Sequence, residues 1–357
     1  IINRLEAKYK QHIDELYSTE EYKQKTLDFV KSVFDYIRSY TKDIFTLFEE
    51  KVILAQGEII STNMVTNYLC EQGVNATLIP ALEYMRTDKN SEPDLTYIRE
   101  KLSAQLEANP DYEIYITQGF ICRNAYGEID NLQRGGSDYT ASLIGAAINA
   151  SEIQIWTDID GMHNNDPRIV DKTAPVRQLH FEEAAELAYF GAKILHPTCI
   201  QPAKYANIPV RLLNTMEPTA PGTLISNDTE KGKIKAVAAK DNITAIKIKS
   251  SRMLLAHGFL RKVFEIFESY QTPIDMVCTS EVGVSMSIDN TKPLNEIVND
   301  LKKYGTVTVD HDMCIVCVVG DLEWENVQRL FAGLSRHYER QSEQQQLHGF
   351  PPGQYHS

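Results

Sequence analysis

Short apolar runs alternate with helical segments through the middle of the chain, and this alternation constrains the fold more than any other feature. Runs with the length of buried strands are Lys51–Ala55, Ala76–Pro80, Glu113–Thr117, Ile153–Thr157 and Pro209–Leu213. Segments with helical spacing are Asp94–Leu106, Tyr139–Ala150, Phe181–Phe190 and Pro197–Ala206. Strands that alternate with helices predict an α/β fold, a mostly parallel sheet sandwiched by helices. Ligands of such sheets bind at the carboxyl ends of the strands.

The two ends of the chain follow other patterns. Residues 1–50 have helical spacing, and the region after residue 229 has the order βαββαβ followed by one further strand, which predicts a small α+β sandwich. The last residues are polar and rich in glutamine, a composition typical of disorder. We therefore predict three parts: a catalytic-type domain at 1–228, an α+β region at 229–334 and a disordered tail at 335–357.

Charge and composition exclude some classes of protein. The formal charge of -13 leaves no surplus of Lys and Arg to neutralise phosphates, so we expect no nucleic-acid partner. No apolar run approaches the roughly 20 residues that span a bilayer, so we expect no membrane contact and a cytoplasmic protein. Cys314 and Cys317 lie in a Val/Ile-rich run, which favours buried thiols on a strand over a zinc or redox site.

Two glycines mark the first candidate site. Thr117–Phe120 follows a strand, and Gln133–Thr140 carries Gly135 and Gly136 at the start of a helix. Glycine lets a backbone approach an anion closely, and a helix N-terminus attracts negative charge. Ser137 and Asp138 suit N-cap positions. A capped helix after a tight turn, without any ligand, is equally compatible with this segment alone.

Three other segments carry polar groups at element ends. The predicted strand Ile153–Thr157 leads into Asp158 and Asp160, which suit either a water-mediated Mg²⁺ contact or an Asp-rich turn. In Phe190–Pro197, Lys193 stands among apolar residues and so requires a partner, whereas His196 is typical of a structural histidine. In the segment Gln56–Ser61, Glu58 is expected where a strand gives way to a helix.

Taken in order, these segments resemble the aspartate kinases of the amino-acid kinase superfamily. The resemblance rests on Gln-Gly-Glu-Ile-Ile-Ser, Thr-Gln-Gly-Phe, Arg-Gly-Gly-Ser-Asp-Tyr-Thr, Trp-Thr-Asp-Ile-Asp-Gly, Asp-Pro-Arg, Phe-Gly-Ala-Lys-Ile-Leu-His-Pro and Pro-Gly-Thr-Leu-Ile, and it extends from about residue 10 to about residue 330. The resemblance implies transfer of the γ-phosphoryl group of ATP, with Mg²⁺, to the β-carboxylate of L-aspartate. The product would be 4-phospho-L-aspartate, on the route to lysine, threonine and methionine.

The resemblance also implies roles for individual residues. It implies that Glu58, Arg134 and Ser137 bind aspartate, and that Asp138 and Arg134 act on the transferring phosphoryl group. It implies a nucleotide site formed by Thr157, Asp158, His163, Arg168, Lys193 and Ile194. No residue is expected to hold a metal ion directly. His163 stands where relatives have Tyr, and the resemblance implies that its ring keeps a contact to the nucleotide.

The α+β region resembles the ACT fold, which binds amino acids. The resemblance implies an effector site formed by Met253, Ala256, Gly258, Phe259, Asp275, Thr279, Ser280 and Glu281. Asp275 would pair with the ammonium group of the effector, which is lysine or threonine, with lysine preferred. A solvated strand residue is the alternative interpretation of Asp275. The resemblance further implies a homodimer through this region, and the second ACT unit is expected to be incomplete.

Departures from the family pattern leave alternatives open. The Lys-Phe-Gly-Gly strand with which the family begins does not occur here, so we expect impaired catalysis from this polypeptide. One alternative is a non-catalytic amino-acid sensor on a degraded kinase scaffold. Another is a glutamate, carbamate or uridylate kinase, which the α+β region and Phe190–Pro197 disfavour.

Overall fold

A computed structural model describes residues 1–40, 45–132, 135–166, 170–190, 195–228, 232–250 and 257–321. Its contacts divide the chain into two compact units. The first unit comprises Ile1–Met162, Pro175–Ala188 and Lys193–Thr229, and the second comprises His163–Ala174, Tyr189–Ala192 and Glu230–Ser357. The second unit therefore includes two short segments that interrupt the first unit along the sequence.

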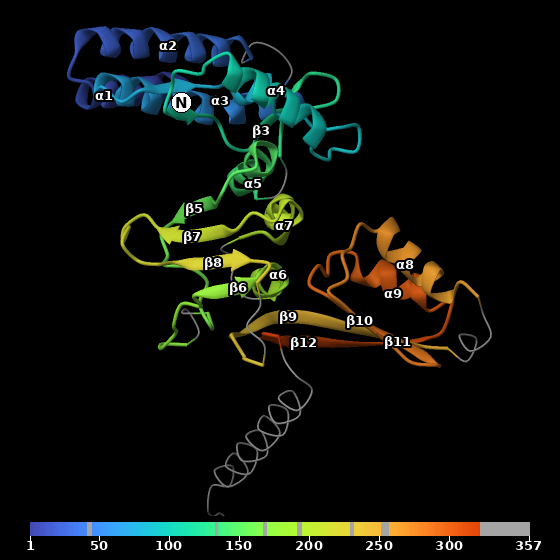
Figure 1. Ribbon diagram of the computed structural model, residues 1–357. Coiled ribbons are helices and arrows are strands. Elements are labelled where there is room, and N and C mark those ends of the chain that lie inside the picture. Colours follow the sequence, from blue (N-terminus) through green and yellow to red (C-terminus); the bar gives the residue numbers. More distant parts are fainter. Residues whose placement is uncertain are drawn as a thin grey trace, which may run out of the picture. The chain divides into compact units, whose positions relative to one another are not determined.

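The first unit opens with three helices that pack against one another (Figure 1). These are α1 (Ile2–Leu16), α2 (Glu20–Ser39) and α3 (Leu47–Glu71). Their shared core contains apolar side chains at helical spacing from all three helices: Ile13, Tyr17, Val30, Val33, Phe34, Ile60 and Met64. The helical prediction for residues 1–40 is confirmed.

The predicted strand Lys51–Ala55 is wrong, because these residues lie inside α3. The helix begins at a capping box, in which the Thr46 side chain accepts from the backbone and Glu49 binds the Thr46 backbone in return. Buried residues then follow the helical pattern i, i+3, i+4 and i+8, at Val52, Ala55, Gln56 and Ile60. A short apolar run is ambiguous between strand and helix, and here the longer helical period prevails. Glu58 consequently lies within a helix rather than at its start.

Next along the chain come short strands and two helices that share one core. The elements are β1 (Ala76–Leu78), the 3-10 helix η2 (Ala81–Glu83), α4 (Leu95–Glu107), β2 (Ile114–Ile116), β3 (Ile121–Arg123), β4 (Ile129–Asn131) and α5 (Gly136–Ile148). Strands β1 and β2 pair in parallel, and β3 and β4 form an antiparallel hairpin. Tyr84, Ile98, Ile121 and Leu143 are fully buried in this core. The hairpin β3–β4 was not expected from the sequence.

A four-stranded sheet completes the first unit. Its strands are β5 (Ile153–Thr157), β6 (Gln178–His180), β7 (Val210–Asn214) and β8 (Thr223–Ser226), in the order β5-β7-β8-β6. The pairs β5–β7 and β6–β8 are parallel, and β7–β8 is antiparallel. Helices α6 (Phe181–Phe190), η3 (Pro197–Ile200) and α7 (Gln201–Ala206) accompany this sheet. Strand β5 buries alternate side chains, so Trp156 is exposed rather than part of a fully buried strand.

The second unit contains the predicted order βαββαβ (Figure 1). Its elements are β9 (Ala236–Lys249), α8 (Phe259–Ser269), β10 (Met276–Thr279), β11 (Gly283–Ile288), α9 (Leu294–Leu301) and β12 (Thr306–Val319). The antiparallel sheet has the order β10-β11-β9-β12, and α8 and α9 pack on one face of it through Ile246, Phe267 and Leu301. The two predicted strands 306–310 and 313–319 form one strand, β12, with register shifts between Asp310 and Ile315.

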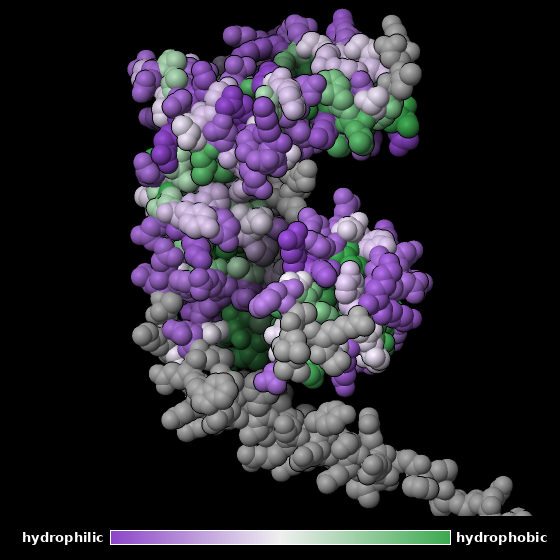
Figure 2. All heavy atoms as spheres, turned by 90° about the vertical axis from the view of Figure 1, so that its right-hand side faces the viewer, coloured by the Kyte–Doolittle hydropathy of each residue, from purple (hydrophilic) through white to green (hydrophobic). Residues whose placement is uncertain are grey.

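The structure bears on three properties that relate to composition: the character of the surface, membrane-spanning helices and the burial of the cysteines. Hydrophilic side chains cover most of the face shown in Figure 2. Of the helices in the described ranges, none combines the length and apolar character that a membrane span requires. All six cysteines are free thiols. Cys314 and Cys317 lie on β12 as predicted, but Cys314 is exposed and Cys317 half-buried, so the prediction that both are buried is wrong.

Candidate active site

The twin glycines form the N-terminus of α5. Gly135 is the N-cap residue, with φ at +69°, and Gly136 is the first residue of the helix. Ser137 and Asp138 therefore lie in the first helical turn, and the prediction that they are N-cap residues is wrong. A glycine N-cap has no side chain with which to accept from the first amides, so the N-terminal end of the helix dipole is left to other acceptors.

The turn Gly119–Phe120 packs directly onto these glycines. A Cβ atom on Gly119 would lie 2.6 Å from Ser137 Oγ, and one on Gly136 would lie 2.7 Å from Phe120 Cβ. Both positions therefore require glycine. Phe120 adopts φ of +52°, an uncommon conformation for an aromatic residue, and its N–H donates to Thr140 Oγ1 at 3.0 Å. Backbone strain of this kind is typical of functional sites.

Gln118 connects this turn to α3, which carries Glu58. The Gln118 side chain is almost fully buried; its Oε1 accepts from Ala81 N–H at 2.7 Å and its Nε2 donates to Thr62 Oγ1 at 2.8 Å. Thr62 in turn donates to the backbone carbonyl of Glu58, one helical turn earlier, at 2.7 Å. Half-buried Glu58 is therefore linked through two hydrogen-bonded side chains to the turn that contacts Gly136 and Ser137.

Two titratable side chains near the α5 N-terminus, those of Asp138 and Cys199, have raised pKa values. Burial raises the pKa of Asp138, because the ionised carboxylate loses hydration there. The buried Cys199 thiol is close by: burial and the charge of Asp138 raise the pKa of Cys199 to about 11. Asp138 is thus an acid whose charged form would be stabilised by an added cation or hydrogen-bond donor.

A second cluster of polar side chains in the first unit lies at the end of β5. Thr157 is half-buried, and its hydroxyl donates to the exposed Asp158 carboxylate at 3.1 Å. The Thr157 carbonyl accepts from Thr215 N–H at 2.8 Å, which ties β5 to the end of β7. Asp160 is half-buried two residues further on. His163 belongs to the second unit, where its Nδ1 lies 2.8 Å from Thr173 Oγ1.

Carboxylate oxygens are the ligands that Mg²⁺ prefers, and Asp158 provides one exposed carboxylate at the end of β5. Within the described ranges, no group of three or more acidic, His or Cys side chains is arranged to hold a metal ion.

Several predicted site residues lie outside the described ranges. They are Arg134, Arg168, Lys193, Ile194, Met253 and Ala256. The roles of these six residues stay predictions.

The described effector-site residues lie at the start of α8, directly before β10 and at the β10–β11 turn. Gly258 is the left-handed N-cap of α8, and Phe259, the first residue of that helix, is buried in the core between the helices and the sheet. Thr279, Ser280 and Glu281 are exposed at the β10–β11 turn, where Ser280 Oγ donates to the Gly283 carbonyl at 3.3 Å. These positions suit a ligand that binds backbone groups, and their role stays a prediction.

Asp275 has protein partners in the second unit. Its side chain is 1% exposed and lies 2.8 Å from Lys240 Nζ, while the Tyr189 hydroxyl donates to the same oxygen, Oδ1. Lys240 also reaches Asp289 at 3.1 Å and lies over the Tyr189 ring. Asp275 Oδ2 is buried without a hydrogen-bond partner among the described atoms. A buried carboxylate oxygen of this kind is an unused acceptor.

Burial acts to lower the pKa of Lys240, but the hydrogen bonds to Asp275 and Asp289 outweigh it and raise that pKa. Burial and the hydrogen bond to Asp275 raise the pKa of Tyr189. The cluster is therefore a charged ammonium and a neutral phenol around one acid.

Some residues that form the two candidate sites could not be found from sequence patterns. Gln118 and Phe120 belong to the segment Thr117–Phe120, which was selected for its glycine, but nothing in the sequence shows which residues these two side chains contact. Cys199, Lys240 and Tyr189 carry no sequence signal, since their partners are distant along the chain.

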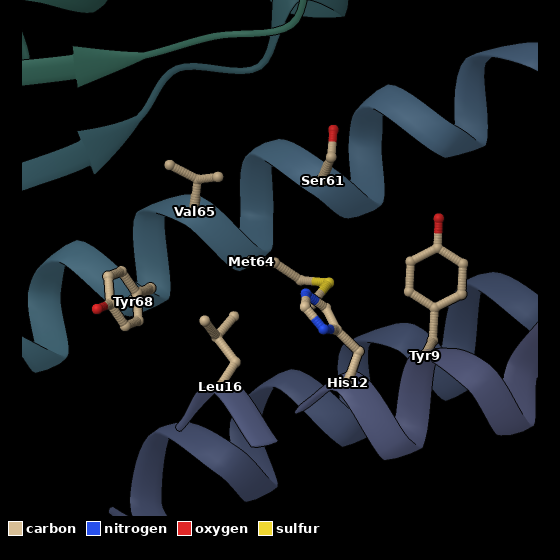
Figure 3. A pocket seen from close by; sticks show the side chains of 7 residues that line it. All are labelled: Tyr9, His12, Leu16, Ser61, Met64, Val65 and Tyr68. Carbon is tan, nitrogen blue, oxygen red and sulfur yellow. The ribbon is translucent and has the colours of Figure 1, made fainter. Parts of the chain in front are cut away.

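A separate pocket of about 340 Å³ lies between α1 and α3 (Figure 3). Its lining is mainly apolar and aromatic: Tyr9, His12, Leu16, Ser61, Met64, Val65 and Tyr68. Ser61 belongs to the candidate segment Gln56–Ser61, which also contains Glu58. Its side chain lines this pocket, and its hydroxyl donates to the Glu58 carbonyl at 3.2 Å. Such a lining does not suit phosphates, so the α5 N-terminus remains the candidate active site.

Comparison with known proteins identifies the class that this fold and site define. A family model described as the amino acid kinase family matches residues 1–214. Aspartokinase 1 of Arabidopsis thaliana, a chloroplastic protein, is 37% identical over 78% of this chain and 52% of its own length. Aspartokinase of Chlamydia trachomatis is 31% identical over 85% of this chain and 72% of its own length. The chain spans about half the length of the Arabidopsis relative.

A solved structure agrees with the sequence comparison. Aspartokinase III of Escherichia coli, in complex with aspartate and ADP, superposes with a TM-score of 0.71 at 31% identity, covering 86% of this chain and 71% of that one. The chain therefore belongs to the amino acid kinase family and, within it, to the aspartokinases.

Proposed function

We propose that this protein is an aspartate kinase that transfers the γ-phosphoryl group of ATP to the β-carboxylate of L-aspartate, forming 4-phospho-L-aspartate. The observation that carries the proposal is the pair of interlocked glycine turns at the N-terminus of α5, with Asp138 in its first turn and Glu58 linked through Gln118. Family membership supports the same activity, since the E. coli relative was solved with aspartate and ADP.

Phosphoryl transfer between two anions depends on positioning and charge neutralisation. In the proposed site, the α5 N-terminus provides backbone amides and positive dipole charge for phosphate oxygens. ATP supplies the phosphoryl group, and its Mg²⁺ would lie near oxygen donors such as Asp158. Arg134, Arg168 and Lys193 are proposed to neutralise the remaining charge. Asp138 is proposed to orient the groups around the transferring phosphoryl.

Recognition of aspartate is proposed to use both charges of the amino acid. Glu58 would accept from its ammonium group, and Arg134 would bind a carboxylate through two parallel hydrogen bonds, which Lys cannot make. Ser137, exposed in the first turn of α5, would donate to the same carboxylate. Thr157, Ile194 and His163 are proposed as nucleotide contacts.

The second unit is proposed to bind an amino-acid effector. E. coli aspartokinase III has also been solved in complex with lysine and aspartate. Lysine is therefore the first effector to test here, with threonine second. The unused oxygen Oδ2 of Asp275 supports an ammonium contact at that residue.

Dimerisation through the second unit is also proposed. Strand β10 lies at one edge of its sheet, and all four of its residues are exposed, including Met276 and Val277. An exposed apolar edge strand is a ready surface for pairing with a second copy.

The test is formation of aspartyl hydroxamate from ATP, Mg²⁺ and L-aspartate, with glutamate as the control substrate. We expect the hydroxamate that forms to come from aspartate and not from glutamate, and calorimetry should detect binding of ADP. Binding of lysine without any binding of ADP would contradict the kinase proposal and favour an amino-acid sensor.

A further inference from the structure

A buried thiol lies directly behind the turn at the α5 N-terminus. Cys199 is fully buried in η3. If Gly135 had a Cβ atom, it would lie 1.8 Å from Cys199 Sγ and 3.2 Å from His196 Cβ. The sulfur therefore occupies the space that any side chain at position 135 would need.

The position of this sulfur is set by η3 itself. His196 is the N-cap residue, and its ring nitrogen accepts from Thr198 N–H at 3.3 Å. The Cys199 N–H donates to the His196 carbonyl at 2.9 Å, and Pro197 restricts the first turn. Cys199 thus presents its sulfur to Gly135 from a short, internally bonded element.

We propose that Cys199 is a positioning residue for phosphoryl transfer: its sulfur supports the left-handed turn at Gly135 and thereby sets the positions of Ser137 and Asp138. This inference rests on the proposed function. It assigns a role to a residue that contacts neither substrate nor nucleotide in that proposal.

The size of the thiol explains why it suits this position. Protein interiors are close-packed, so a larger side chain would have to move the turn and a smaller one would leave a void. Burial and Asp138 keep the thiol neutral at physiological pH, because the pKa of Cys199 is raised to about 11. A neutral sulfur packs beside Asp138 without charge repulsion.

The test compares Cys199→Val, Cys199→Ser and Cys199→Ala with Cys122→Val. Cys122 is also fully buried in the first unit, but in the core around Ile121 and Leu143, so it is a matched control. We expect Cys199→Val to lower kcat on the order of 10- to 100-fold, since small misplacements of catalytic groups have effects of this size. Cys199→Ser, close to the thiol in size, should restore most of kcat, and Cys199→Ala should lie between. Cys122→Val should lower Tm and leave kcat unchanged well below Tm.

Amide resonances, which do not depend on turnover, distinguish the proposed role of Cys199 from the proposed kinase function. Amide resonances of Gly135, Gly136 and Asp138 should shift in Cys199→Val and stay in place in Cys122→Val. Unchanged resonances, or a loss of Tm in Cys199→Val with kcat unchanged, would overturn the role of Cys199 alone. A wild-type chain that neither binds ADP nor forms aspartyl phosphate would overturn the proposed function, whatever the resonances show.

Discussion

At the scale of single residues, two glycines with the same left-handed backbone face different surroundings. Gly127 has φ of +84° and no atom within 4 Å of where a Cβ would lie, whereas Gly135 has φ of +69° and Cys199 Sγ at 1.8 Å. The left-handed conformation alone costs a residue with a side chain about 1–2 kcal/mol. Steric overlap in a packed site adds roughly 1–3 kcal/mol.

We therefore predict that Gly127→Ala lowers the free energy of unfolding by about 1 kcal/mol and that Gly135→Ala lowers it by roughly 2–5 kcal/mol. Urea denaturation of both variants measures the difference. Equal losses would mean that Cys199 moves aside without resistance.

Asp138 provides a second prediction at this scale. Burial raises its pKa above the ordinary 3.8, so ionisation is disfavoured in the folded state. Asp138→Asn should therefore raise Tm at pH 7, and the difference should vanish as pH falls below 3.8, where the carboxyl is protonated in both folded and unfolded chains.

The same substitution should lower kcat by about 100-fold or more, because the proposed role of Asp138 is to position the reacting atoms. Thermal melts across pH and the hydroxamate assay check both parts. A variant with lower Tm and full kcat would contradict both.

At the scale of elements, the start of α2 depends on a side chain from α3. The Glu71 carboxylate accepts from Ser18 N–H and Thr19 N–H at 3.0 and 2.6 Å and from the Thr19 hydroxyl. Thr19 is the N-cap residue of α2, so a distant acid satisfies the first amides of the α1–α2 loop. The hydrogen bond from the Thr19 side chain, together with the backbone bonds, lowers the pKa of Glu71.

We predict that Glu71→Ala lowers Tm at pH 7. Because the folded pKa lies below the ordinary 4.5, the stabilisation is present above that value and is lost as pH falls through the folded pKa. The wild type and the variant should therefore melt together at low pH. Gln11→Ala is the control, since the Gln11 side chain donates to the exposed Glu15 four residues away on the same helix. A Tm difference that persists at low pH would exclude the carboxylate as the cause.

Helices and strands in which apolar residues follow a regular pattern over several residues could be predicted from the sequence, and shorter elements could not. Strand β5 and helix α6 have the predicted bounds, because the apolar run in one and the helical spacing in the other continue over the whole element. The strands β3, β4, β6 and β8 are three or four residues long, too short for a period to be recognised. Residues 51–55 needed the register of the whole of α3 to be identified as helical.

At the scale of the whole molecule, ligand binding should appear as a change in stability. Lys240 binds oxygen Oδ1 of the Asp275 carboxylate, whose other oxygen, Oδ2, is proposed to bind an effector ammonium. Lys240→Met should lower the free energy of unfolding by roughly 1–3 kcal/mol, since the buried Asp275 carboxylate loses one of its two partners and its only charged one among the described residues. It should also tighten lysine binding by roughly tenfold, because no internal ammonium competes.

Calorimetry and thermal melts with and without lysine measure both effects. Lysine should recover more Tm in the variant than in the wild type. Lys247→Met is the matched control, because Lys247 pairs with Asp310 at 2.7 Å on the exposed part of the same sheet. That change should stay within about 0.5 kcal/mol. Weaker lysine binding in Lys240→Met would mean that Lys240 supports the effector rather than competing with it.

The sequence by itself determined the α/β alternation, the βαββαβ order of the second unit and the motifs that identify the aspartokinase family. Each of these depends on residues close together in the chain, where side-chain periodicity and turn chemistry act. Only the tertiary structure decided that Cys199 lies behind Gly135, that Gly119 and Phe120 pack onto Gly136 and Ser137, and that Lys240 already holds Asp275. These contacts join residues far apart in sequence, and packing between elements brings them together without leaving any local pattern.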